Sequence, residues 1–215
     1  MIKILCYGDS NTYGYDPVSG RYPIEKRWTT ILGDILGNTY QVLNEGQNGR
    51  TTAFDSYGGH ADNGLANLGT CLERNAPVDF IVFMLGTNDC ATLLNLSPEN
   101  IAGGMEQLLL KILQYRDNGE TGNLKIVLIA PPAIRNGFEQ SPFAFQLDAS
   151  SVMKSEAIVP LYRRLAEKYA CLFLDASDLD VSTNDCEHLT IKGHKVLATR
   201  LAPLIKADLL TVISN

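Results

Sequence analysis

Residues 2–12 read Ile2-Lys3-Ile4-Leu5-Cys6-Tyr7-Gly8-Asp9-Ser10-Asn11-Thr12. The mostly apolar run over 2–7 predicts a β-strand that is buried on both faces, as in a parallel sheet. A Gly-Asp-Ser turn follows this strand at once. Ligands of an open α/β sheet bind beyond the carboxyl ends of its strands, so Ser10 is well placed to be a nucleophile. Such a serine needs a base within hydrogen-bond reach.

The rest of the chain alternates strand and helix signals. Strands are predicted over 2–7, 40–43, 80–85, 125–130 and 171–174. Apolar residues at helical spacing predict helices over 28–36, around 65–72, from Ser97 onward, near 159–169, and after Thr190 with a bend at Pro203. Two segments, 13–26 and 131–151, are expected to be irregular. The alternation predicts an α/β fold, with a parallel sheet covered by helices on both faces.

Length and composition limit the classes of protein to consider. The chain has 215 residues, of which 45% are hydrophobic and 20% charged, and one domain over 1–215 is expected. A net charge of -6 argues against nucleic acid or an anionic membrane as the main partner. Neither a signal peptide nor an apolar run long enough to cross a bilayer is visible. The five cysteines form no Cys-x-x-Cys pair, which favours free, mostly buried thiols and a cytoplasmic location.

Polar segments follow the predicted strands or precede the last helix. They are Gly8-Asp9-Ser10, Asn44-Glu45-Gly46-Gln47-Asn48-Gly49-Arg50, Gly86-Thr87-Asn88-Asp89 and Asp185-Cys186-Glu187-His188. His188 is the candidate base for Ser10, and Asp185 would hold its other ring nitrogen and stabilise the imidazolium. The candidate donors to an oxyanion are the Ser10 N–H, the Gly49 N–H and the Asn88 side-chain amide. These residue types together predict acyl transfer.

Structural readings compete with several of these assignments. Ser10 and Asn88 could be ordinary turn residues, and Gly46 competes with Gly49 for the oxyanion role. Asp9 and Asp89 are expected to be structural acceptors. His60, in a glycine-rich stretch, is expected to be solvated. The dispersed histidines and unpaired cysteines make a zinc site improbable, and no phosphate-binding glycine motif follows the first strand, so no cofactor is expected.

Aromatic residues in the segment 131–151 also have two readings. Phe138, Phe143 and Phe145 could form the wall or lid of a pocket for an acyl or aryl group. They could equally be a packed loop or an interface between subunits. The sequence leaves these two readings open.

The polar segments resemble the SGNH (GDSL-type) hydrolases over residues 2 to about 205. Ser10, Gly49, Asn88 and His188 match the four residues that give this family its name, in the same order, and Asp185 stands three before the histidine. The resemblance implies a flavodoxin-like three-layer α/β/α sandwich with a five-stranded parallel sheet. The family spacing favours Gly49 over Gly46 and Asp185 over Glu187, which is the fallback. It also implies a packing role for His194.

Within that family the chain looks most like the aryl-esterase/acyltransferase (perhydrolase) branch. The shared phrases are Ile4-Leu5-Cys6-Tyr7-Gly8-Asp9-Ser10, Arg27-Trp28-Thr29, Glu45-Gly46, Arg50-Thr51-Thr52 and Met84-Leu85-Gly86-Thr87-Asn88-Asp89. That branch implies hydrolysis of small short-chain esters, acyl transfer to alcohols or peroxide, and homo-oligomers. Asn11-Thr12-Tyr13 departs from the Leu-Thr-Trp common there, and Gly49 stands where that branch can carry alanine; both put transfer in question. The alternatives are a carbohydrate O-acetyl esterase and a catalytically silent binding or assembly protein.

Overall fold

The computed structural model describes residues 1–117 and 124–213 of the chain. This part contains one sheet of five strands in the order β2-β1-β3-β4-β5, and every neighbouring pair runs parallel. The strands are β1 (Ile2–Gly8), β2 (Tyr40–Gly46), β3 (Phe80–Met84), β4 (Lys125–Ala130) and β5 (Leu172–Asp175). The predicted α/β class and the five strand positions are confirmed. β2 runs three residues further than predicted, because Asn44, Glu45 and Gly46 continue its pairing with β1.

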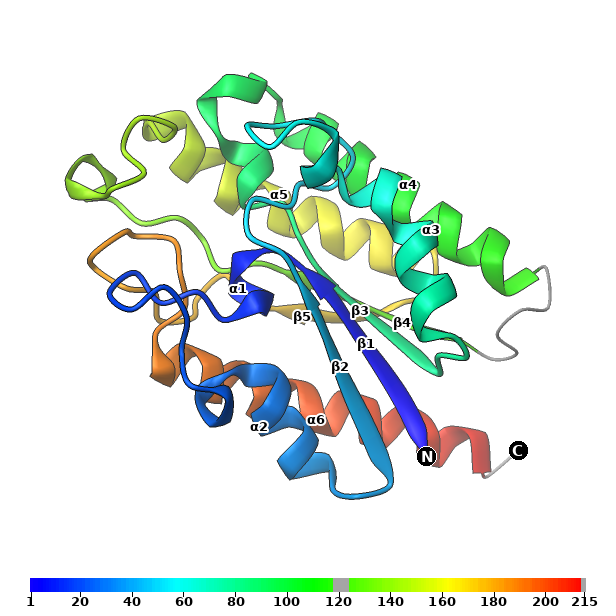
Figure 1. The fold of residues 1–215 in the computed structure, drawn as a ribbon. Helices are drawn as coiled ribbons and strands as arrows, with labels where there is room; N and C mark the ends of the chain where they lie inside the picture. The colour runs from blue at the N-terminus through cyan, green and yellow to red at the C-terminus, as the bar shows by residue number, and fades with distance from the viewer. Residues whose placement is uncertain (118–123, 214–215) are drawn as a thin grey trace.

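Helices cover both faces of the sheet, which gives three layers (Figure 1). One face carries α2 (Trp28–Leu36) and α6 (Ile191–Ile213), and the other carries α3 (Gly64–Asn75), α4 (Pro98–Asp117) and α5 (Ala149–Lys168). The remaining helix, α1 (Ser10–Tyr13), is a single turn directly after β1. Short 3-10 turns lie at Ile24–Lys26, His60–Asp62, Asn88–Cys90, Thr92–Leu94 and Phe138–Gln140.

Two apolar cores flank the sheet, and β1 contributes to both. Leu5 and Tyr7 pack towards α3, α4 and α5, whereas Ile4 and Cys6 pack towards α2 and α6. Side chains of a strand alternate between the faces of its sheet. A strand covered on both sides must therefore be apolar at nearly every position. This explains the mostly apolar run that precedes Gly8. It also determines where β1 ends and the turn after it begins.

The helix predicted near 159–169 begins ten residues earlier. Asp148 caps α5 by accepting a hydrogen bond from the Ser151 N–H, and the Ser151 hydroxyl accepts one from the Asp148 N–H. The first half of α5 is rich in serine and charged residues, so its apolar stripe is weak. Buried Ser151 and Ser155 satisfy their hydroxyls on backbone carbonyls instead. Pro203 lies inside α6, which continues on both sides of it.

None of the helices in the described ranges combines the length and the apolar character needed to span a lipid bilayer.

Candidate active site

The strand-to-helix turn after β1 presents Ser10. Asp9 is the N-cap of α1 and accepts a hydrogen bond from the Asn11 N–H at 2.9 Å. Gly8 is required here, because a Cβ at this position would lie 2.1 Å from Thr12 Oγ1. Ser10 is the first residue of α1, so its N–H has no carbonyl acceptor within the helix. The turn therefore leaves both the hydroxyl and the N–H of Ser10 facing the same end of the sheet.

Ser10, His188 and Asp185 form a continuous chain of hydrogen bonds. Ser10 Oγ lies 2.7 Å from His188 Nε2, and His188 Nδ1 lies 2.9 Å from Asp185 Oδ2. The other oxygen, Asp185 Oδ1, accepts from the N–H groups of Glu187 and His188 at 3.2 and 3.1 Å. Cys186 makes this tight loop with a left-handed φ of 66°. The structure thus brings together the three side chains that the sequence predicted as nucleophile, base and orienting acid.

The charges around His188 favour its protonated form. Burial opposes protonation, but the hydrogen bond that His188 donates to Asp185 and the negative charges of Glu187, Asp185 and Asp9 outweigh it and raise the pKa of His188 above its usual value. Glu187 Oε1 lies 4.0 Å from His188 Nδ1, whereas Asp185 makes the hydrogen bond. Asp185 is therefore the residue that orients the ring, and Glu187 acts on it through space.

Asn11 clamps the histidine loop, a contact that the sequence did not suggest. Its Nδ2 donates to the Glu187 carbonyl at 3.2 Å, and its Oδ1 accepts from the Leu189 N–H at 2.8 Å. The amide thus bonds the backbone on both sides of His188. Asn11 is buried, and the Trp28 indole N–H donates to the backbone carbonyl of Asn11 at 3.1 Å. The only signal in the sequence was the departure from the Leu common in the resembling branch.

Gly49 rather than Gly46 offers an uncommitted N–H. The Gly46 N–H donates to Asn44 Oδ1 at 3.0 Å, and a Cβ at Gly46 would lie 2.0 Å from the Tyr13 N. Gly49 has a φ of 79° and lies in the cavity wall with Ser10 and Asn88. Among the described residues its N–H finds no acceptor. Gly46 is therefore needed for close packing, and the geometry favours Gly49 as an anion donor.

Asn88 is held in place by the loop that carries Gly49. Its Nδ2 donates to the Arg50 carbonyl at 3.0 Å, and the side chain lines the same cavity. The second amide hydrogen is left for a ligand. Asp89 fixes this region, because the Thr52 N–H donates to both of its oxygens at 3.1 and 3.0 Å. Asp9 and Asp89 thus act as the structural acceptors that were expected.

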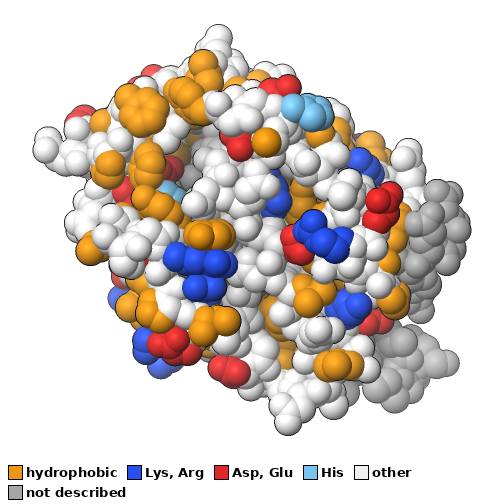
Figure 2. Space-filling model, in the orientation of Figure 1, with side chains coloured by type: hydrophobic (Ala, Val, Ile, Leu, Met, Phe, Trp, Pro, Cys, Tyr) orange, Lys and Arg blue, Asp and Glu red, His pale blue; other side chains and the backbone are white. Residues whose placement is uncertain are grey.

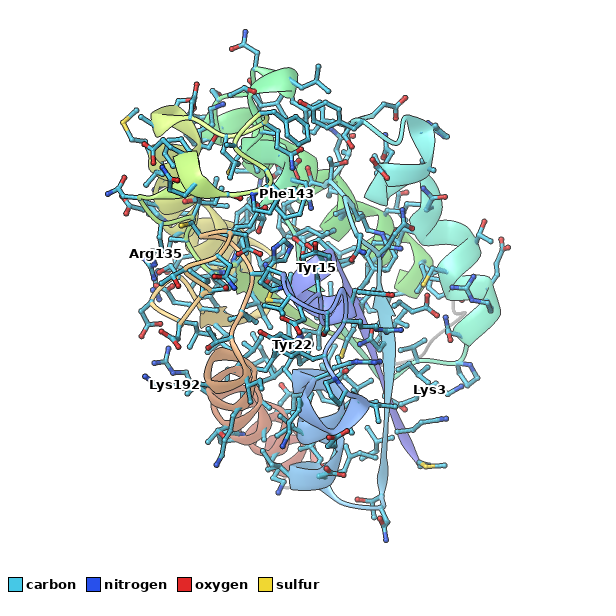
Figure 3. All side chains as sticks on the ribbon, turned by 60° about the vertical axis from the view of Figure 1, so that its left-hand side comes forward. Lys3, Tyr15, Tyr22, Arg135, Phe143 and Lys192 are labelled. Carbon is cyan, nitrogen blue, oxygen red and sulfur yellow. The ribbon has the colours of Figure 1, made fainter. Side chains whose placement is uncertain are left out.

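The cavity in front of Ser10 has a volume of about 350 Å³ and aromatic walls. The ring centroids of Tyr15 and Phe143 lie 4.5 and 5.7 Å from that of the His188 imidazole, and Figure 3 labels Tyr15 and Phe143 in the same part of the molecule. Phe145 also lines the cavity, and its ring meets that of Tyr57 at 5.8 Å. Hydrophobic side chains gather at the upper left of the molecule, where the 131–148 segment lies (Figure 2). Phe143 and Phe145 are thus wall residues.

Three expectations outside the cavity can be compared with the structure. Phe138 is buried in the core towards α5 and does not line the cavity. His60 is exposed beside Asp55, at 3.2 Å. His194 is buried, and its Nδ1 accepts from the Trp28 N–H at 3.3 Å. His194 therefore joins α6 to α2, in line with the packing role that the resemblance implied.

Within residues 1–117 and 124–213, no group of three or more His, Cys, Asp or Glu side chains is arranged to hold a metal ion.

Comparison with known proteins gives a consistent result. The sequence pattern of the GDSL-like Lipase/Acylhydrolase family matches residues 6–196. A carbohydrate acetylesterase family member from Sinorhizobium meliloti is similar, with 32% identity, a TM-score of 0.85, and coverage of 96% of this chain and 98% of that one. The aryl esterase of M. smegmatis has 29% identity and a TM-score of 0.88, over 96% of this chain and 99% of the other. A putative arylesterase from Agrobacterium tumefaciens str. C58 has 31% identity and a TM-score of 0.84, over 96% and 99%. None of the curated proteins compared by sequence matches.

Proposed function

The chain belongs to the GDSL-like Lipase/Acylhydrolase family, and we propose that it hydrolyses short-chain carboxylic esters through an acyl-enzyme on Ser10. Family and structural relatives agree on a serine carboxylic ester hydrolase with a flavodoxin-like fold. The observation that carries the choice of residues is the chain of hydrogen bonds from Ser10 through His188 to Asp185, at 2.7 and 2.9 Å. The substrate is a small molecule that enters the cavity in front of Ser10.

The mechanism follows from the order of these contacts. His188 Nε2 takes the proton of Ser10 as the oxygen attacks the ester carbonyl, and Asp185 stabilises the resulting imidazolium. The N–H groups of Ser10 and Gly49 and the amide of Asn88 hold the oxyanion. His188 then gives its proton to the departing alcohol, which leaves the acyl group on Ser10. A water molecule, deprotonated by the same imidazole, releases the acid.

Replacement of Ser10 tests this assignment. The change Ser10→Ala should lower kcat for p-nitrophenyl acetate by about four orders of magnitude, with residual turnover from the oxyanion donors. Ser177→Ala is the matched control, because Ser177 also follows a strand, but its hydroxyl bonds the Asp175 carboxylate and it does not line the cavity. Near-wild-type turnover by the Ser10 variant would remove this residue from the mechanism. Covalent labelling of the wild type by an organophosphonate, detected by mass, separates an esterase from a silent binding protein.

A carbohydrate O-acetyl esterase is the second candidate. The S. meliloti relative favours it, and so does the polar part of the cavity wall, where Ser56, Asp62 and Gln146 could meet hydroxyl groups. Specificity constants for aryl acetates against O-acetylated sugars decide between the two. A strong preference for the sugars would replace the aryl-esterase reading and keep the same mechanism.

We also propose acyl transfer, oligomerisation and a cytoplasmic location as further properties. Aromatic walls that exclude water favour an alcohol or peroxide acceptor over water. Tyr57, Leu93 and Phe145 are exposed, and such apolar side chains suit contact between subunits. The five free thiols in the described residues suit a reducing compartment. The ratio of ester product to acid in the presence of ethanol tests acyl transfer. Light scattering tests oligomerisation, and cell fractionation tests the location.

A further inference from the structure

The cavity wall contains carboxyl groups without a lysine or arginine partner. Asp62 and Glu187 both line the cavity, together with the rings of Tyr15, Tyr57 and Phe143. Among the described residues that form this wall, none is lysine or arginine. Carboxylates and aromatic faces both attract positive charge. The site described above uses neither Asp62 nor Glu187 to make or break a bond.

Glu187 is the more unusual of the two. Its side chain is only 8% exposed, it faces the cavity, and no described residue donates a hydrogen bond to it. The nearest positive group would be His188, but the Nδ1 proton of that ring is directed to Asp185 at 2.9 Å, whereas Glu187 is 4.0 Å away. A buried carboxyl without a donor costs folding free energy. A ligand that supplies a donor or a positive charge here would recover that cost.

Asp62 is held rigidly with one oxygen free. Ser56 Oγ and the Gly58 N–H both donate to Oδ2, at 2.5 and 2.7 Å. Oδ1 receives no hydrogen bond from the described part of the chain, and it would lie 3.5 Å from a Cβ placed on Gly49. The free oxygen is therefore fixed beside the oxyanion loop. Asp62 and Glu187 belong to different loops, so their carboxyl groups line the cavity from separate elements.

The basic groups near the site are engaged elsewhere. Arg50 is buried, donates to the carbonyls of Gly8 and Glu45, and stacks on the Tyr7 ring at 4.0 Å. Arg135 donates to the Ser177 carbonyl at 2.7 Å. In Figure 3, Arg135 and Lys192 lie at the edge of the molecule, away from the paired rings of Tyr15 and Phe143. The cavity thus carries a net negative field.

We propose that the cavity selects esters by charge: it takes those with an ammonium group remote from the scissile bond and rejects those with a carboxylate. Glu187 and Asp62 are the specificity-determining residues, and the aromatic rings supply cation–π contact. This inference rests on the proposed esterase function. It names a substrate class, namely short acyl esters of amino alcohols or amino sugars.

Three aryl acetates of nearly equal size test the proposal. They are phenyl acetates that carry trimethylammoniomethyl, neopentyl or carboxymethyl in the para position, where the methylene limits the effect on leaving-group reactivity. We expect kcat/KM for the cation to exceed that for the neutral ester about tenfold, and the anion to be about tenfold poorer. High salt should reduce both ratios. Equal constants would overturn the proposal and leave the esterase function intact.

Charge-neutral variants assign the effect to residues. Glu187→Gln and Asp62→Asn should each bring the cation-to-neutral ratio several-fold closer to one at pH 8.5, which lies above the pKa of about 7 that burial gives Glu187. Asp34→Asn is the control, because it removes one negative charge from a surface that faces another cavity. It should leave the ratio unchanged. A ratio that persists in both cavity variants contradicts the roles of Glu187 and Asp62.

Binding without turnover separates this proposal from the catalytic one. Calorimetry on the Ser10→Ala protein should give benzyltrimethylammonium a Kd at least about tenfold below that of phenylacetate. O-acetylated glucosamine and O-acetylated glucose form a second pair. Equal affinity for these two sugars would show that hydroxyl groups, not charge, are recognised. This result, or equal binding of the cation and the anion, would overturn selection by charge even if the protein proved catalytically silent.

Discussion

Asn11 holds His188, the proposed base, close to Ser10, the proposed nucleophile. The residue lies next to Ser10, and its amide bonds the backbone on both sides of His188. A shift of the histidine loop would therefore have to break two buried hydrogen bonds. The clamp gives the imidazole a fixed distance from Ser10 Oγ, which is the kind of positioning that proximity effects depend on.

Loss of this clamp should affect kcat more than KM. Asn11→Leu leaves a buried N–H and carbonyl unpaired, so we expect about 2–4 kcal/mol less stability and a kcat lowered by about tenfold or more. Asn11→Asp keeps the acceptor for the Leu189 N–H and should recover part of kcat. Asn63→Leu is the matched control, because Asn63 also bonds backbone with both ends of its amide, at Ala53 and Ala66 rather than in α1 or the histidine loop. A similar fall in kcat there would mean that the effect is only structural.

The pH profile should report the charge of Glu187. His188 must be neutral to act as a base, so kcat/KM falls as pH drops through its raised pKa. Glu187 is one of the charges that raise this pKa. Glu187→Gln should therefore move the acid limb of the profile to lower pH. A profile measured from pH 5 to 9 with a neutral ester checks this, and an unmoved or upward-shifted limb would contradict it.

Close contact between β2 and α1 determines the shape of the oxyanion side. Gly46 ends β2, and a Cβ there would meet the backbone of Tyr13 and Thr12 at 2.0 and 2.5 Å. Because backbone cannot move aside as a flexible side chain can, α1 would have to shift. Ser10 is part of α1, so the packing of this strand end bears directly on the nucleophile.

The substitution Gly46→Ala should therefore be severe. We expect a loss of about 3 kcal/mol or more in the free energy of unfolding, measured by urea denaturation. Gly103→Ala on α4 is the control, because a Cβ there meets nothing within 4 Å. It should stabilise the helix by about 0.5–1 kcal/mol. Equal effects of the two changes would show that the contact at Gly46 relaxes easily.

The elements differ in how well the sequence predicted them. Strands were found because burial on both faces leaves continuous apolar runs, as in 125–130, where both bounds are right. The start of α5 was missed because a serine-rich first turn has no apolar stripe. The pairing of Ser10 with His188 was predicted from the residue types that follow the strands or precede the last helix, and the family resemblance supported it. The side-chain roles of Asn11 and Asp62 depend on tertiary contacts that no local pattern encodes, and all catalytic roles stay predictions.

Buried carboxyl groups shape the stability of the whole molecule. Burial raises the pKa of Asp9 to about 6 and those of Asp89 and Glu187 to about 7. The folded protein therefore binds protons that the unfolded chain has released above about pH 4. Burial lowers the pKa of His194 to about 4, which acts in the opposite direction. The raised pKa of His188 acts in the same direction as the three carboxyl groups, so four groups against one histidine give a net loss of stability as pH rises.

The melting temperature should therefore be highest at acid pH. We expect Tm to be highest near pH 5 and about 5 °C or more lower at pH 7.5. Exposed carboxylates with lowered pKa, such as Asp16 and Asp178, contribute only at lower pH. Glu187→Gln should make the fall of Tm between pH 5 and pH 7.5 smaller. A Tm that rises steadily from pH 4 to 8 would contradict this account.

The union of residues 10 and 188 at one end of the sheet has a consequence for biosynthesis. On the ribosome the hydroxyl of Ser10 emerges before the imidazole of His188, which lies 178 positions further along the chain. Under the proposed mechanism, a product that stops before residue 188 lacks its base, and a release of colour from a chromogenic ester would report that the chain has folded through both residues. Two complementary fragments, one bearing each residue, would stay dark until they reassociate.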